Sequence, residues 1–183
     1  RSGAGDVGRH SGRAAAGDHQ PHPAVARRLT PRERTVELAA AGAFIAVSAA
    51  MSATAAPEPV GTATLLVLSY ALVRRVRFQL GPGLIRPTQV VFVPMLFLLP
   101  ASSVPLWVAC GLILAGLGPS AHPERMLSSI GDAWHAVGPS LVIVAAGEPA
   151  ANLAALPVVA AAFAAQCATD AVSATAREWL GRG

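Results

Sequence analysis

The sequence predicts an all-α protein: a polytopic transmembrane bundle of about six spans, preceded by a disordered N-terminal leader. Three observations predict this fold class. Of the 183 residues, 53% are hydrophobic and only 13% are charged, whereas about a quarter of the residues in a soluble domain are charged. Long windows without any charged residue follow one another from residue 35 onward. The basic residues are all arginine or histidine, and the arginines cluster between these windows.

The first 34 residues differ in composition from the rest. They hold seven arginines against three acidic residues, and they contain no Phe, Tyr or Trp. Such a segment cannot bury enough apolar surface to offset the entropy of ordering. It also lacks the aromatic rings that stack on nucleic acid bases, so we expect no nucleic-acid partner. We therefore divide the chain into a disordered, Arg-rich cytoplasmic leader at residues 1–34 and a transmembrane helical domain at residues 35–183.

The windows between charges locate the spans in order, because a bilayer-crossing helix needs about 20 mostly apolar residues. One window of 37 residues is too long for a single span, and we divide it at the turn-like stretch 100–105. The six segments are residues 38–57, 59–73, 88–99, 104–117, 133–147 and 149–169. The third is short and contains Pro94, which removes a helical hydrogen bond. Two alternatives stay open for it: a full span extended back to Gly83, or a re-entrant half-helix.

The arginines also predict the orientation, because short cytoplasmic loops are enriched in Lys and Arg. With six spans, the cytoplasmic segments are residues 1–36, 74–87, 118–126 and 176–183. These segments contain all 14 arginines, and the turns on the other side contain none. We therefore expect a multi-pass protein of the cell (inner) membrane with both termini in the cytoplasm.

Few polar residues remain at membrane depth, and they form the candidate site. Asp132 and His135 are three residues apart, and Gln166 and Asp170 are four apart, so each pair shares a helix face. The predicted intramembrane polar cluster consists of Arg77, Arg86, Gln89, Asp132, His135, Gln166 and Asp170. We expect at least one aspartate to face the bundle interior and to engage an arginine near the loop at residues 74–86, with Arg77 and Arg86 as the favoured partners, or the two aspartates to share a proton. A structural ion pair that fixes helix register is the other interpretation.

The sequence contains no recognisable catalytic motif. It has no nucleophile elbow, no His-Glu-x-x-His, no Gly-rich phosphate loop and no closely spaced pair of cysteines. Cys110 and Cys167 lie in apolar runs, where cysteine acts as a small packing residue. We therefore predict that the chain is not an enzyme and holds neither a cofactor nor a metal. An intramembrane enzyme would need a nucleophile and a base, for which His135 with Ser128 or Ser140 is the candidate.

Four segments carry a resemblance to a known group of proteins. They are RFQLGPG at residues 77–83, PTQVVFVPMLFLLP at 87–100, GDAWHAVGP at 131–139 and REWL at 177–180. Over about residues 60–180 the chain resembles the membrane-embedded N-terminal module of actinobacterial signalling proteins. In that group the module precedes a cytoplasmic GGDEF diguanylate cyclase or HD-type phosphohydrolase domain. The resemblance implies a sensor or anchor module of the cyclic-dinucleotide type, whose partners are the lipid bilayer and an output domain or a second copy.

No GGDEF, EAL or HD motif occurs in these 183 residues, so an output domain would have to lie outside this chain. The alternative function is transport. A six-helix, Ala-rich protein of this size is similar in outline to the substrate-binding subunits of vitamin importers of the energy-coupling-factor type. Such a subunit would need an outward-facing ligand pocket, whereas the polar residues here gather on the cytoplasmic side.

Overall fold

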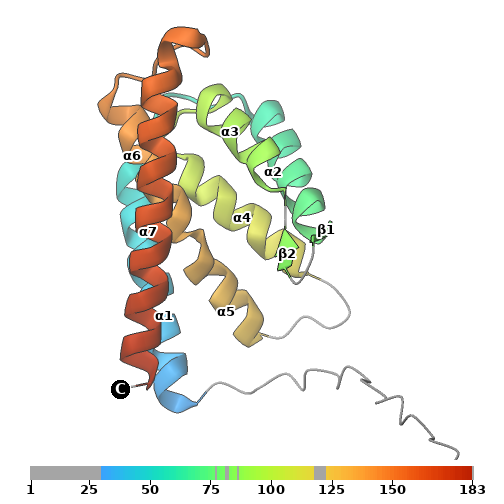
Figure 1. The fold of residues 1–183 in the computed structure, drawn as a ribbon, viewed down its shortest axis with the longest axis vertical. Coiled ribbons are helices and arrows are strands. Elements are labelled where there is room, and N and C mark those ends of the chain that lie inside the picture. The colour runs from blue at the N-terminus through green and yellow to red at the C-terminus, as the bar shows by residue number, and fades with distance from the viewer. Residues whose placement is uncertain (1–29, 77, 81–82, 86, 118–122, 183) are drawn as a thin grey trace, which may run out of the picture.

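The computed structural model describes residues 30–76, 78–80, 83–85, 87–117 and 123–182, and within them the fold is helical apart from one short β-hairpin (Figure 1). The elements are α1 (Pro31–Ser52), α2 (Val60–Arg75), β1 (Phe78–Leu80), β2 (Gly83–Ile85), α3 (Gln89–Leu98), α4 (Val104–Gly116), α5 (Pro123–Asp132), the 3₁₀ helix η1 (Ala133–Ala136), α6 (Val137–Ala145), the 3₁₀ helix η2 (Leu153–Ala155) and α7 (Leu156–Arg182). A helix thus occupies each of the six predicted segments, which confirms the all-α class.

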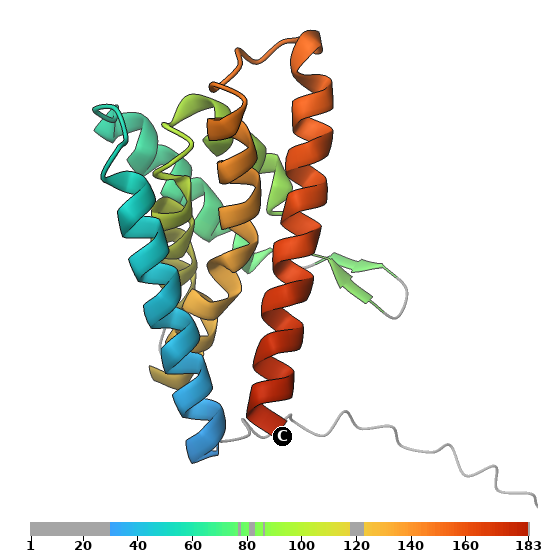
Figure 2. The same cartoon turned by 90° about the vertical axis from the view of Figure 1, so that its left-hand side faces the viewer.

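The helices form an up-and-down bundle. α5, η1 and α6 follow one another directly and form one bent rod that contacts both α1 and α7. α6 packs along α7, and α2 packs along α4. Figure 2 shows that α1 begins and α7 ends at the same end of the bundle. We call this the arginine end, because Arg32, Arg74 and Arg177 lie in the parts of α1, α2 and α7 that are nearest to it.

Helix length and apolarity do not confirm the six predicted spans. Among the described residues, two helices are long and apolar enough to cross a bilayer: Pro31–Ser52 and Leu153–Gly181, each with a mean hydropathy of 1.5. α3 and α4 are apolar but shorter. The structure therefore supports a helical bundle with two helices of spanning length, and the remaining four segments are helices of less than spanning length by this measure.

The start of α1 corrects the predicted domain boundary. Residues 31–34 were assigned to the disordered leader, but they form the first turn of α1. The Thr30 hydroxyl accepts a hydrogen bond from the Glu33 backbone N–H, and the Glu33 carboxylate accepts one from the Thr30 N–H. This capping box, with Pro31 at the first helical position, satisfies the backbone donors that a helix start leaves unpaired. The rest of the leader, residues 1–29, lies outside the described residues.

The loop predicted at residues 74–87 contains the hairpin. β1 and β2 are antiparallel, with Phe78 opposite Ile85 and Leu80 opposite Gly83. The third segment therefore does not extend back to Gly83 as a helix, because this residue belongs to β2. α3 is a ten-residue helix that contains Pro94.

The fifth segment also begins earlier than predicted. Its helix starts at Pro123, so residues 123–126, which were expected in a loop, are helical. The helix changes to 3₁₀ geometry over Ala133–Ala136. Pro139 explains this change, because a proline ring inside a helix clashes with the carbonyl four residues earlier, here that of His135. The change places Asp132, the last residue of α5, at a bend.

Large apolar side chains lie both in the core and on the surface of the bundle. The core contains large side chains such as Tyr70, Phe44 and Phe92, but also the fully buried Ser48 and Ser140. Many large apolar side chains face outward, including Leu65 at 65% and Val172 at 69% exposure. Contiguous apolar surface of this kind, where it occurs, marks a place that contacts protein or membrane. Lipid tails would cover such a surface without cost, because they are as apolar as the side chains.

Candidate functional site

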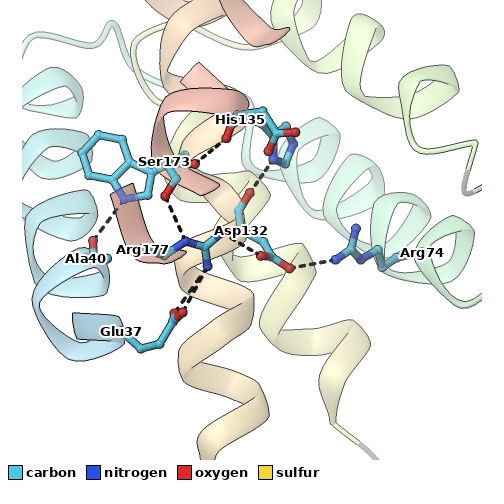
Figure 3. Close-up of polar contacts among 9 residues, drawn as sticks. Glu37, Ala40, Arg74, Asp132, His135, Ser173 and Arg177 are labelled. Atoms are coloured by element: carbon cyan, nitrogen blue, oxygen red, sulfur yellow. Dashed lines mark hydrogen bonds and ion pairs between the residues drawn. The ribbon is translucent and has the colours of Figure 1, made fainter. Parts of the chain in front are cut away.

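Four charged side chains from four helical segments meet toward the arginine end (Figure 3). The Asp132 carboxylate, at the end of α5, lies 3.4 Å from the Arg74 guanidinium of α2 and 3.3 Å from that of Arg177 in α7. Arg177 also lies 3.4 Å from the Glu37 carboxylate of α1. We call Glu37, Arg177, Asp132 and Arg74 the charge network. Its charges alternate in sign along the chain of contacts, so the four groups together are neutral.

The charge network is partly shielded from solvent. The side chains of Arg177 and Glu37 are 17% and 16% exposed, and that of Asp132 is 45% exposed. Ion pairs on the surface contribute little to stability, because water and salt screen their charges. Partial burial reduces this screening for the charge network. Removing one of the four side chains would leave a partly buried charge without its partner, and this would destabilise the fold. Arg177 is the centre, because it contacts an acid on each side and its Nε donates to the Ser173 carbonyl at 3.4 Å.

A glycine makes room for the charge network. A Cβ atom on Gly131 would lie 2.7 Å from an Arg177 Nη atom and 2.9 Å from a Glu37 carboxylate oxygen. Both distances are shorter than van der Waals contact, so any side chain at position 131 would displace the ion pair. The glycine beside Asp132 is thus part of the site's geometry.

His135 joins the charge network to the core. Its Nδ1 lies 2.6 Å from the Asp132 carbonyl oxygen, and its Nε2 lies 3.4 Å from the Tyr70 hydroxyl. A carbonyl oxygen can only accept, so Nδ1 carries a proton, and in the neutral imidazole Nε2 then accepts from the Tyr70 hydroxyl. The imidazole also meets the Phe92 ring edge-on, with centroids 5.6 Å apart. The bend after Asp132 is therefore held by contacts to α2 and α3.

Trp134 forms a second contact from the bend. Its indole N–H donates to the Ala40 carbonyl of α1 at 3.1 Å (Figure 3). Its ring meets Phe44 edge-on at 5.7 Å. A backbone carbonyl inside a helix is already engaged in the helical ladder, so this bond uses its second lone pair. Positions 132–135 therefore contact α1, α2, α3 and α7.

The structure brings together only part of the predicted polar cluster. Asp132 and His135 belong to it as expected, and Asp132 pairs with Arg74 and Arg177 instead of sharing a proton with Asp170. Asp170 is exposed, and within the described residues its carboxylate forms no ion pair. Gln89 is exposed at the first residue of α3, and Gln166 is half-buried in α7. Arg77 and Arg86 lie outside the part of the chain whose side chains the structure describes.

Sequence reasoning missed Glu37, Arg177, Tyr70 and Gly131, and among the arginines at residues 74–86 it favoured Arg77 and Arg86 over Arg74 as the partner of an aspartate. Glu37 was treated only as the limit of the first charge-free window, and Arg177 only as a cytoplasmic arginine within the REWL segment. Glu37 adjoins the predicted cytoplasmic segment 1–36, and Arg177 lies in the predicted cytoplasmic segment 176–183. Their location on the same side of the bundle was the available signal. Nothing in the sequence pointed to Gly131, because its role depends on how α1 and α7 are placed around α5.

The charge network can bind and orient, because its ion pairs join α1, α2, α5 and α7. In the described residues, no group of three or more His, Cys, Asp or Glu side chains is arranged to hold a metal ion. Comparison with family models, with curated proteins and with solved structures finds no match to this chain. The proposed function therefore rests on the charge network and on the exposed apolar side chains of the bundle.

Proposed function

We propose that this chain is the membrane-embedded sensor or anchor module of a signalling protein of the cyclic-dinucleotide type, acting on an output domain that is not part of these 183 residues. In this proposal the bundle crosses the membrane six times, both termini are cytoplasmic, and the chain itself performs no catalysis. The observation that carries it is Arg177, which connects the last helix to Glu37 of α1 and to Asp132 of α5.

The position of Arg177 supports a role in transmission. α7 has 27 residues, and its C-terminal turns lie at the arginine end. A shift of α7 along or around its axis would have to break the contacts of Arg177. A stimulus that alters the position of α1, α2 or the bend at Asp132 would likewise reach α7 through the charge network. Two discrete arrangements of such a network would give a switch with a defined output helix.

The membrane setting is supported by the outward-facing apolar side chains and by the arginine distribution. The two longest apolar helices, α1 and α7, are also the two that meet at Arg177. The importer alternative is less well supported, because an apolar cavity lies between α1 and α7 beside Arg177. That is the cytoplasmic side in the proposed topology, opposite to where an importer receives its substrate.

A fusion experiment tests the transmission role. A reporter cyclase domain would be joined after Gly183, and its output in cells compared for Asp132→Asn and Asp170→Asn. The two variants make the same chemical change, but only Asp132 forms ion pairs in the described structure. Loss of a hydrogen bond between charged groups is worth about 1.5–3 kcal/mol, which shifts a two-state equilibrium by about tenfold or more.

We therefore expect Asp132→Asn to change the reporter output strongly at equal protein abundance, and Asp170→Asn to leave it near the parent value. Equal outputs from the parent and from Asp132→Asn would contradict the proposed transmission role. Membrane fractionation of each fusion serves as the control for insertion.

A further inference from the structure

An apolar groove of about 690 Å³ lies between α1 and α7 toward the arginine end. The indole of Trp134 lines it, together with small or apolar side chains that include Ala39, Ala40, Val172 and Ala176. Its volume is in the range of pockets that bind small organic molecules. The groove is bounded by the two helices of spanning length, so in the proposed membrane placement it is accessible from the lipid.

Among the described residues that line this groove, Arg32 is a cation without an ion-pair partner. Arg32 of α1 lines the groove, and its Nε donates to the Leu180 carbonyl of α7 at 2.8 Å. Arg177 also lines the groove, but it is paired with Glu37 and Asp132. Within the described residues Arg32 takes part in no ion pair. The guanidinium therefore keeps a positive charge and further N–H donors beside an apolar surface.

We propose that the groove binds one anionic phospholipid, with the lipid phosphate on Arg32 and an acyl chain lying along Trp134 and Val172. This inference rests on the membrane placement proposed above. Both parts of a phospholipid match the groove. A guanidinium pairs well with the phosphate of the headgroup, and the small side chains leave an apolar channel that can hold an acyl chain. Anionic lipids are concentrated in the cytoplasmic leaflet, and basic pockets between helices on that side are where their headgroups bind.

The positive charge of Arg32 favours a lipid over a second copy of the chain as the occupant of the groove. A symmetric contact of two copies through this groove uses the same surface on both. It would add a second uncompensated Arg32 to the same interface, and like charges brought together there are unfavourable. A phosphate supplies the missing negative charge instead.

The test uses the full chain and two matched substitutions. Arg32→Gln and Arg34→Gln remove the same charge from the same turn region of α1, but only Arg32 lines the groove. Gln at position 32 keeps an N–H donor for the Leu180 carbonyl. The protein would be reconstituted in vesicles of phosphatidylcholine with a minor fraction of phosphatidylglycerol, and then released for native mass spectrometry.

We expect the parent and Arg34→Gln to retain one phosphatidylglycerol per chain, with about a tenfold preference over phosphatidylcholine, the effect of one charge-assisted contact. Arg32→Gln should lose that preference. In vesicles, phosphatidylglycerol with brominated acyl chains should quench tryptophan fluorescence of the parent more than brominated phosphatidylcholine. The difference should persist in Trp179→Phe, which leaves Trp134 in the groove.

Three outcomes would overturn the lipid site while the protein stays embedded: equal retention of the two lipids by the parent, equal losses in Arg32→Gln and Arg34→Gln, or two chains released together without lipid. A protein that alkaline carbonate extracts from the vesicles would instead contradict the membrane placement. The two failures are thus distinguishable.

Discussion

At the scale of single residues, Arg177 is the side chain on which the charge network depends most. Its guanidinium lies between the carboxylates of Glu37 and Asp132, and Asp132 in turn contacts Arg74. Groups linked in this way do not contribute independently, because removing one changes the electrostatic environment of all the others. The network should therefore show coupling that a set of isolated surface pairs would not.

A double-mutant cycle measures this coupling. Asp132→Asn and Arg177→Gln, combined, should destabilise the protein less than the sum of the single effects, with a coupling of about 0.5–3 kcal/mol. The cycle of Asp170→Asn with Arg177→Gln should be additive, because Asp170 forms no ion pair among the described residues. Unfolding in one detergent, followed by circular dichroism, gives the required free energies. Equal coupling in both cycles would show that the charges act only through a diffuse field.

At the scale of elements, the contact between α6 and α7 depends on a glycine. A Cβ atom on Gly138 would lie 2.6 Å from the Ala165 backbone carbonyl oxygen. A backbone atom cannot move aside as a flexible side chain can, so the two helices would have to separate. The close approach of α6 and α7 thus requires glycine at position 138.

Gly138→Ala is therefore expected to destabilise the bundle by about 1–3 kcal/mol, as overpacking does. Gly42→Ala is the matched control, because a Cβ atom there meets nothing within 4 Å. Alanine is the better helix former by about 0.5–1 kcal/mol, so Gly42→Ala should be neutral or stabilising. Thermal unfolding of both variants in the same detergent checks this, and a similar loss at both positions would exclude the backbone clash as the cause.

The elements also show what the sequence could predict. Charge-free windows, one of them divided at the turn-like stretch 100–105, located the six predicted segments, each of which contains a helix. This was possible because apolarity over many residues is a property that sequence alone contains. The hairpin was missed because each of its strands has three residues, too few for a periodic pattern. The change to a 3₁₀ helix before Val137 depends on Pro139, a signal that was present but was not used.

The site was less predictable than the fold for a physical reason. Asp132 and His135 could be recognised because polar residues are rare in the apolar windows. Their partners could not, since the choice of Arg177 or Arg74 depends on how α7 and α2 are rotated and placed. Such tertiary placement is not encoded in the spacing of residues along one helix.

At the scale of the whole molecule, the distribution of arginine predicts how the bundle is oriented. All 14 arginines fall in the segments expected on the cytoplasmic side. A reporter that is active only outside the cytoplasm should give a signal when it is fused after Glu148 and none when it is fused after Gly183. A cytoplasm-active reporter at the same two positions is the control and should give the opposite pattern. Signal at both positions from either reporter would contradict the six-span orientation.

The unequal helix lengths have a consequence for the surrounding bilayer. α3 has ten residues and α4 has thirteen, which correspond to rises of about 15 and 20 Å. A typical hydrocarbon core is about 30 Å thick. In the proposed placement, lipids beside α3 and α4 must therefore thin locally, whereas those beside α1 and α7 need not. This hydrophobic mismatch on one side of the bundle costs energy that depends on the length of the acyl chains. In the proposed placement, the thickness of the host membrane would therefore influence the position of α7.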